Sequence, residues 1–298
     1  MLGQLIATIL KTNFWDFQAN MIIDGRKIAQ KIFDELRLQN MQNHSMPLLC
    51  DVVVGDSSVS RQYVEIKERK AKSSGFAFKA VYLPEFSTTS DVAQAVTDVQ
   101  KLENISGIIV QLPMPAHIDR RVVTEAIDPK YDVDCLTEAN ARHFYDRVED
   151  AFVFPTALAC EEILNSTGVE LSNKNIVIIG EGELVGAPLK SLLLRKGLQV
   201  FSINKETENK KEIIKNADVI VSAAGAPKFL TADMLKVGAI VVDAGTAESN
   251  GSVVGDVDAD SVETTASFFA KVPGGVGPVT VAMLLRNVRK AYISNHGH

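Results

Sequence analysis

Hydrophobic residues occur in short runs along this chain, and charged stretches separate the runs. The apolar runs at 48–54, 76–82 and 105–111 have the length and residue types of buried strands. The charged stretches at 63–73 and 90–102 lie between them and are expected to be helical. Strands that alternate with helices are typical of a parallel sheet. The pattern therefore predicts an α/β domain that ends near residue 150.

A second series of the same kind follows. A helix is expected at about 157–166, and the β-branched runs after it end in Gly, Asn or Asp, as strands of a nucleotide-binding half do. A break rich in Gly and Pro at 273–280 precedes a last helix, expected at about 279–291. The strand candidates of this series lie at 175–179, 199–203, 219–223 and 240–243.

These two series predict a two-domain α/β protein. An N-terminal α/β substrate domain is expected at 21–150, and a Rossmann-like, doubly wound nucleotide-binding domain at 151–278. The C-terminal helix, within 279–298, is expected to return to the first domain. Residues 1–20 are interpreted as an extension ahead of a natural start at Met21. A length of 298 residues suits two domains that each bury a core.

Composition narrows the functional classes. Hydrophobic residues make up 46% and charged residues 23%, as in globular proteins. The formal net charge of -6 argues against nucleic acid as a partner, because phosphate binding depends on clustered Lys and Arg. The three cysteines, Cys50, Cys135 and Cys160, are widely spaced, which fits a reducing compartment. With no signal peptide or membrane span recognised, a cytoplasmic protein is expected.

Candidate active-site residues lie on a helix and at the end of a strand. Tyr63 and Lys67 are four residues apart, which places a ring and an amine on one helix face. A solvated helix with a tyrosine at its edge is the simpler interpretation. Gln111 ends its strand at the carboxyl edge of the sheet, where ligands bind in open α/β folds. There it could hydrogen-bond a lysine and influence its basicity.

A pair of carboxylates follows in a loop. Asp132 and Asp134 could recognise the amidine-like edge of a heterocycle, or they could cap a helix, and the residues alone favour the cap. None of the five histidines belongs to a metal-ligating pattern, so no metal site is expected.

Taken together, these segments resemble the bifunctional methylenetetrahydrofolate dehydrogenase/cyclohydrolase family in order and spacing. The resemblance covers nearly everything after Met21. Its most specific parts are Tyr63 with Lys67, Gln111-Leu-Pro, Asp132-Val-Asp134 and Val272-Pro-Gly-Gly-Val-Gly-Pro-Val-Thr-Val-Ala-Met-Leu284.

The resemblance implies two reactions, oxidation of 5,10-methylenetetrahydrofolate with NAD(P)+ and hydrolysis of the methenyl form to 10-formyltetrahydrofolate. It implies a pterin near Tyr63, an active-site amine at Lys67 partnered by Gln111, and Asp134 binding the pterin ring. A lysine held partly neutral by burial could position or deprotonate the attacking water.

The resemblance also assigns the loop before the last helix to the substrate and implies a homodimer. Gly274, Gly275 and Pro278 are the expected substrate-binding residues, with the glycines letting backbone approach the ligand.

The cofactor side departs from the family pattern. The turn Gly180-Glu181-Gly182-Glu183-Leu184-Val185-Gly186 follows the first strand of the second domain, where a pyrophosphate can meet free amides. The family usually carries an Arg and a Ser here for the 2'-phosphate of NADP. A carboxylate repels a phosphate, so the resemblance implies NADP while Glu181 makes NAD a candidate. The expected cofactor-binding residues are Gly180, Glu181, Gly182, Gly186, Lys205 and Thr246.

Three alternatives remain open from the sequence. Lys205 could rescue a phosphate contact, although a surface lysine is the commoner explanation. The chain could be a cyclohydrolase with weak or lost dehydrogenase activity, because the cofactor turn has diverged. It could also be a folate- or nucleotide-binding protein without turnover.

Overall fold

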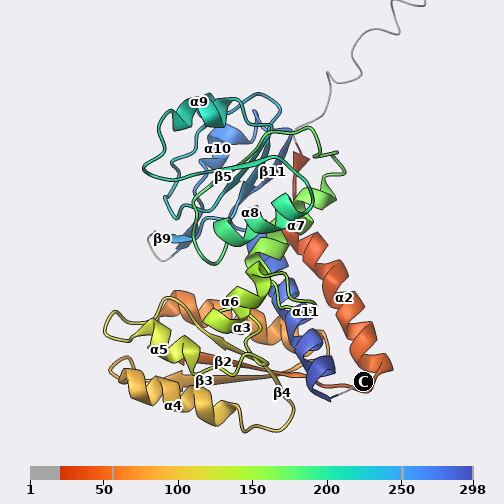
Figure 1. Ribbon diagram of the computed structural model, residues 1–298, viewed down its shortest axis with the longest axis vertical. Helices are drawn as coiled ribbons and strands as arrows, with labels where there is room; N and C mark the ends of the chain where they lie inside the picture. The colour runs from red at the N-terminus through yellow and green to blue at the C-terminus, as the bar shows by residue number, and fades with distance from the viewer. Residues whose placement is uncertain (1–20, 56, 250–251, 297–298) are drawn as a thin grey trace, which may run out of the picture.

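The computed structural model describes residues 21–55, 57–249 and 252–296, and Figure 1 shows them as two parallel sheets surrounded by helices. The proposed extension at 1–20 lies outside the described residues. The first sheet holds three strands in the order β3-β2-β4, and the second holds six in the order β1-β11-β8-β7-β5-β6. All pairings within these two sheets are parallel. The prediction of an α/β protein is confirmed.

The first sheet is built around a strand buried on both faces. β2 (Leu48–Val54) coincides with the predicted strand, and its neighbours are β3 (Ala77–Leu83) and β4 (Ile105–Val110). Every residue of β4 is buried. Helices α3 (Ser58–Ser73) and α4 (Thr89–Val99) supply the crossovers that parallel strands require.

The second sheet has the strand order of a doubly wound fold. β5 (Ile176–Ile179) pairs with β6 (Val200–Ile203) on one side and β7 (Val219–Ser222) on the other. The order in which the chain adds strands therefore reverses at β5, since β6 lies on one side of it and β7 on the other. At such a point a crevice opens at the carboxyl ends of the strands. β8 (Ile240–Asp243) and β11 (Phe268–Ala270) extend the sheet beyond β7.

The chain first joins the second sheet before it builds the first. β1 (Met21–Ile22) pairs with β11, and α2 (Gly25–Gln42) then runs to the first domain. A strand of two residues is too short to produce a hydrophobic period. The sequence pattern therefore did not reveal this strand.

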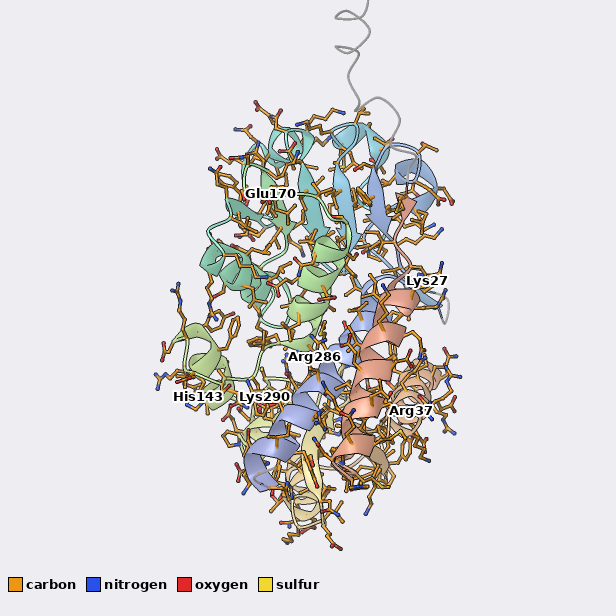
Figure 2. All side chains as sticks on the ribbon, turned by 90° about the vertical axis from the view of Figure 1, so that its right-hand side faces the viewer. Lys27, Arg37, His143, Glu170, Arg286 and Lys290 are labelled. Atoms are coloured by element: carbon orange, nitrogen blue, oxygen red, sulfur yellow. The ribbon has the colours of Figure 1, made fainter. Side chains whose placement is uncertain are left out.

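Three helices join the two sheets. α7 (Pro155–Ser166) and α11 (Val276–His296) pack on each other, and α2 lies along α11 (Figure 2). One apolar cluster contains Ile109 of β4, Val288 of α11 and Val242 of β8, so the core runs from one sheet to the other. The last helix does return to the first domain, as predicted.

The last helix begins at Val276, three residues earlier than expected. Pro278 therefore lies in its first turn, where backbone N–H groups have no helical partner and a proline costs little. The remaining elements are α5 (Arg120–Glu125), α6 (Glu138–Tyr145), α8 (Gly186–Arg195), α9 (Lys210–Lys215), η1 (Ala232–Met234), β9 (Ala247–Ser249), β10 (Ser252–Val254) and α10 (Ala259–Val262).

Candidate active site between the two domains

The amine of Lys67 lies at the carboxyl edge of the first sheet. Its Nζ donates a hydrogen bond to Gln111 Oε1 at 2.7 Å, and the residue as a whole is buried. Gln111 directly follows β4, and its own amide donates to the Leu112 carbonyl oxygen at 2.9 Å, which fixes its orientation. Tyr63 lies one helical turn before Lys67 and is half-buried, and burial raises its pKa. The structure thus brings together the amine and the amide that the sequence singled out.

A second partner of this amine escaped the sequence analysis. Asp51 Oδ2 lies 2.6 Å from Lys67 Nζ, and the Asp51 side chain is fully buried. This ion pair adds to the hydrogen bond with Gln111, so two side chains hold the Lys67 amine in place. Asp51 interrupts the apolar run 48–54, and a lone carboxylate in a strand buried on both faces is a signal that a charged partner must be present.

The two loop aspartates have different roles. Asp132 accepts hydrogen bonds from the backbone N–H groups of Leu136 and Thr137, both at 2.9 Å, and from the Thr137 hydroxyl at 2.7 Å. Thr137 in turn caps α6. The helix-capping interpretation therefore applies to Asp132, whereas no backbone N–H among the described residues donates to the side chain of Asp134.

Asp134 interacts with the residues around the amine. Burial, together with the charge of Asp132, raises the pKa of Asp134 to about 7, and the charge of Lys67 opposes this rise. The loop is held by Asn287 of α11, which donates to the carbonyl oxygens of Val133 and Val153, both at 2.8 Å. The last helix thus fixes the position of Asp134 beside the first sheet.

The glycines before α11 pack against the chain itself. A Cβ on Gly25, the first residue of α2, would lie 1.8 Å from the Gly275 carbonyl oxygen, and Gly25 N–H donates to the Gly274 carbonyl at 2.9 Å. Gly274 has φ +107°, a conformation that requires glycine. A close backbone contact is therefore made here to α2, at the junction of the two domains.

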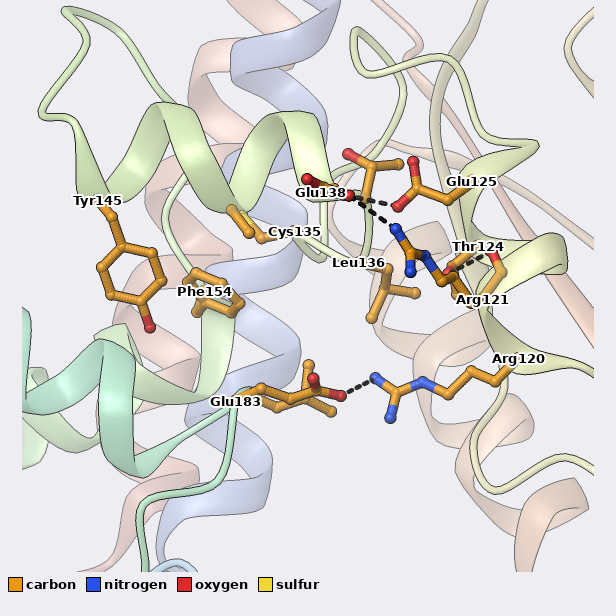
Figure 3. A pocket seen from close by; sticks show the side chains of 13 residues that line it. Arg120, Arg121, Thr124, Glu125, Cys135, Leu136, Glu138, Tyr145, Phe154 and Glu183 are labelled. Atoms are coloured by element: carbon orange, nitrogen blue, oxygen red, sulfur yellow. Dashed lines mark hydrogen bonds and ion pairs between the residues drawn. The ribbon is translucent and has the colours of Figure 1, made fainter.

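A cavity of about 420 Å³ lies next to the loop that carries Asp134 (Figure 3). Its walls are α5, α6 and the residues just before α6 from the first domain, and Phe154, Glu183 and Leu184 from the second. Glu183 Oε1 is 2.7 Å from an Arg120 guanidinium nitrogen, so an ion pair joins the domains here. Lys67, Gln111 and Tyr63 do not line this cavity.

The glycine-rich turn of the second domain leaves room for a ligand. A Cβ on Gly180 would lie 2.4 Å from the Ala223 carbonyl oxygen, and one on Gly186 would lie 1.9 Å from the Gly180 carbonyl oxygen. These two glycines let the turn fold tightly between β5 and α8. Gly182 has no atom near its Cβ position, so the turn is open there. An open turn at a helix start can receive a pyrophosphate, so the residues present fit a dinucleotide.

Glu181 faces the end of β6. It accepts hydrogen bonds from the Ser202 hydroxyl and from Asn204 Nδ2, the latter at 2.8 Å. These bonds, the Ser202 one foremost, lower the pKa of Glu181, so the carboxylate is charged at neutral pH. The cation beside it is Lys190 at 3.6 Å, on α8. Lys205 was the lysine that the sequence offered for a phosphate contact, and its carbonyl oxygen accepts a hydrogen bond from Lys210. Thr246, the other expected cofactor-binding residue, is exposed just beyond β8.

Comparisons with known proteins agree with this geometry. The family profile for the tetrahydrofolate dehydrogenase/cyclohydrolase catalytic domain matches residues 23–134, and the one for the NAD(P)-binding domain matches residues 155–296. The chain is 41% identical over 270 residues to the bifunctional protein FolD of Campylobacter concisus, covering 89% of this chain and 95% of that protein. The chain belongs to the tetrahydrofolate dehydrogenase/cyclohydrolase family.

Solved structures of this family have the same fold. The bifunctional enzyme FolD of Campylobacter jejuni is 33% identical with a TM-score of 0.86, covering 92% of this chain and 99% of that one. The Trypanosoma brucei enzyme, solved with NADP and an inhibitor, is also 33% identical, with a TM-score of 0.86 and 93% and 99% coverage. This chain is therefore an enzyme of one-carbon metabolism with dehydrogenase and cyclohydrolase activity and an NAD(P)-binding domain. The alternatives of a lone cyclohydrolase or a non-catalytic binding protein are not favoured.

We expect Asp134→Asn to stabilise the protein at alkaline pH. Because the folded-state pKa of Asp134, about 7, lies above its ordinary value, the folded protein retains a proton that the unfolded chain has lost between about pH 4 and pH 7. The contribution of this group to stability therefore falls as pH rises across that window. Thermal unfolding at pH 5 and pH 8 should give a gain for the variant that is larger at pH 8. An equal change at both pH values would contradict this expectation.

Proposed function

We propose that Lys67 carries the proton of the hydrolytic step and that Gln111 orients it. The observation that supports this is the 2.7 Å hydrogen bond between the two side chains at the carboxyl edge of the first sheet. Water that adds to the methenyl carbon gives up a proton to the Lys67 amine. The resulting ammonium returns a proton to the departing ring nitrogen as the carbon–nitrogen bond breaks. The hydroxyl of the adduct releases its proton to solvent as its C=O bond forms, which leaves the formyl group on the other nitrogen.

We propose that Tyr63 and Asp134 bind the pterin. Tyr63 offers an aromatic face on the same helix side as Lys67. Asp134 as a carboxylate accepts hydrogen bonds from the donor edge of the ring. Its raised pKa means that folate binding should weaken as pH falls below about 7. Gly274, Gly275 and Pro278, at the domain junction, are proposed to border the same ligand.

The second domain is proposed to prefer NAD. When bound, the dinucleotide would supply the acceptor for the hydride that leaves the methylene carbon. Gly180, Gly182 and Gly186 shape the turn that would hold the pyrophosphate. The carboxylate of Glu181, in the same turn, lies next to the end of β6. An acidic side chain near the end of the second strand is the usual partner of a free ribose 2'-hydroxyl. A direct assay would supply purified protein with 5,10-methylenetetrahydrofolate and either cofactor, and follow reduced cofactor and methenyl intermediate together.

We propose that the active form is a homodimer joined through the edge of the first sheet. β3 pairs only with β2 within the described chain, which leaves a seven-residue edge unpaired. Such edges invite a further strand. Tyr82 at the end of this strand and Phe86 just beyond it have exposed fractions of 53% and 85%. A second copy of the chain would cover both aromatic rings.

The homodimer predicts a change of mass in solution. Phe86→Glu places a charge in the proposed interface, so light scattering should give a lower mass at micromolar concentration. Phe201→Glu is the matched control, since Phe201 lies exposed on the edge strand β6 of the other sheet. A monomeric parent, or equal effects of the two substitutions, would rule out this interface.

The place of action is proposed to be the cytoplasm. All three cysteines are free and buried, as suits a reducing compartment. Within the described residues, no helix is long and apolar enough to cross a membrane.

A further inference from the structure

Asp51 has a single close partner in a fully buried position. Its Oδ2 lies 2.6 Å from Lys67 Nζ. Among the described residues, no other hydrogen-bond donor reaches either carboxylate oxygen. Burial raises the pKa of Asp51, while the charge of Lys67 opposes this rise. A buried carboxylate without further hydrogen bonds is costly, so the pair is not explained by stability alone.

The same amine serves two acceptors on neighbouring strands. Asp51 lies on β2, and Gln111 follows β4, which pairs directly with β2. An ammonium has three N–H groups, so two of them are occupied by these acceptors and one remains for a ligand. The two strands together therefore fix both the position and the direction of the amine.

We propose that Asp51 is a positioning residue that holds Lys67 against Gln111 as an ammonium and thereby sets the pH range of the hydrolytic step. This inference rests on the proposed role of Lys67. In the hydrolytic cycle the amine must accept a proton from water, so the ammonium must first lose a proton. A carboxylate at 2.6 Å opposes that loss. Asp51 therefore shifts the pH range of hydrolysis upward. The pH range of hydride transfer should not shift in this way, because that step needs no proton at this nitrogen.

Other charged groups lie around the amine on the elements that pack near it. Asp134 acts from the loop after β4, with Asp132 behind it and Arg120 of α5 beside it. Tyr82 of β3 lies near Asp51, with Arg61, Glu65 and Glu68 of α3 around the tyrosine. Toward α2, helix α3 presents Lys70, which donates to Gln30 at 3.3 Å, and Arg289 of α11 donates to Asn40. Among these groups, Asp51 is the one in ion-pair contact with Lys67.

The test is the pH dependence of cyclohydrolase kcat in Asp51→Asn. Asparagine keeps the shape and removes the charge, so the acidic limb of the profile should move to lower pH by about one unit or more. Saturating folate is needed because Asp134 acts on KM. Asp51→Glu restores the charge and should move the limb back toward the parent. Asp98→Asn, an exposed neutralisation on α4, is the matched control and should leave the profile unchanged.

An unchanged limb in a folded Asp51→Asn protein would overturn the proposal. If that variant does not fold, thermal unfolding of Lys67→Met and Lys67→Met/Asp51→Gln supplies an independent measurement. Lys67→Met leaves the carboxylate buried and unpaired, so it should lower Tm, and neutralising Asp51 should recover part of the loss. Additive losses would contradict the pairing. A failure of the proposed role of Lys67 is recognised separately, because cyclohydrolase turnover would then survive Lys67→Met.

Discussion

Replacing Lys67 is expected to lower cyclohydrolase turnover by about 100-fold or more, because a side chain that transfers protons in the transition state contributes at least that much. Lys67→Met is the preferred variant, since methionine fills the space of the alkyl chain without a charge. Dehydrogenase turnover should fall much less, because hydride transfer requires no proton from this amine. Both activities should be measured on the same preparation, where this one substitution should lower the cyclohydrolase rate far more than the dehydrogenase rate.

The buried ion pair determines how this experiment must be controlled. Removing Lys67 alone leaves Asp51 unpaired, so a loss of activity could reflect a weakened fold. Lys67→Met should therefore also be made in the Asp51→Asn background, where no buried charge is left over. Lys72→Met on the exposed face of the same helix controls for loss of a lysine. Cyclohydrolase turnover within about threefold of the parent in the double variant would reject the role of Lys67.

The sequence predicted much of the fold because the strands are buried on both faces. β2 and β8 coincide with predicted runs, since apolar residues there are continuous and bounded by turn residues. β1 and β11 are short, and their pairing depends on residues far apart in the chain. Such pairing follows from the tertiary fold and leaves no local period.

The candidate site was only partly predictable from the sequence. Residue spacing and the end of a strand singled out Lys67 and Gln111 as candidates, and the family resemblance then implied their roles. Asp51 was overlooked as one polar letter in an apolar run, although the cost of burying a charge is reason to look for a partner. The residue pattern alone did not separate the two loop carboxylates, and Asp134 was chosen on the family resemblance, because only the tertiary structure shows that Asp132 is bound to the start of α6.

The cofactor turn illustrates the same limit. Its glycines and Glu181 are evident in the sequence, but the cation that compensates the carboxylate is not. Lys205 is nearer to the end of β6 along the chain, yet Lys190 of α8 is the lysine at 3.6 Å from Glu181. A helix that packs beside the turn presents side chains from one face, and which face it presents depends on packing.

Glu181→Arg is expected to shift selectivity toward NADP by about 100-fold, which corresponds to about 2.8 kcal/mol. The charged carboxylate lies beside Ser202 and Asn204 at the end of β6, where a ribose 2'-phosphate would have to bind. Two like charges about 4 Å apart repel by about 1 kcal/mol in water and about 4 kcal/mol near a protein surface, and Glu181 is partly exposed, which places it between these limits. An arginine would replace this repulsion by a bidentate ion pair with the phosphate. The ratio of kcat/KM for NADP to that for NAD is the quantity to measure.

Two further variants decide whether the charge itself sets this preference. Glu181→Gln removes the repulsion without adding a cation, so its ratio should lie between those of the parent and Glu181→Arg. Glu170→Arg makes the same charge change at an exposed carboxylate that also accepts a hydrogen bond from a serine, Ser172, and it should leave the ratio unchanged. If Lys190 instead neutralises Glu181 and keeps a phosphate site usable, the parent prefers NADP and Lys190→Ala impairs NADP far more than NAD. That result would reject the electrostatic argument, because a carboxylate already neutralised by its neighbour cannot exclude the phosphate.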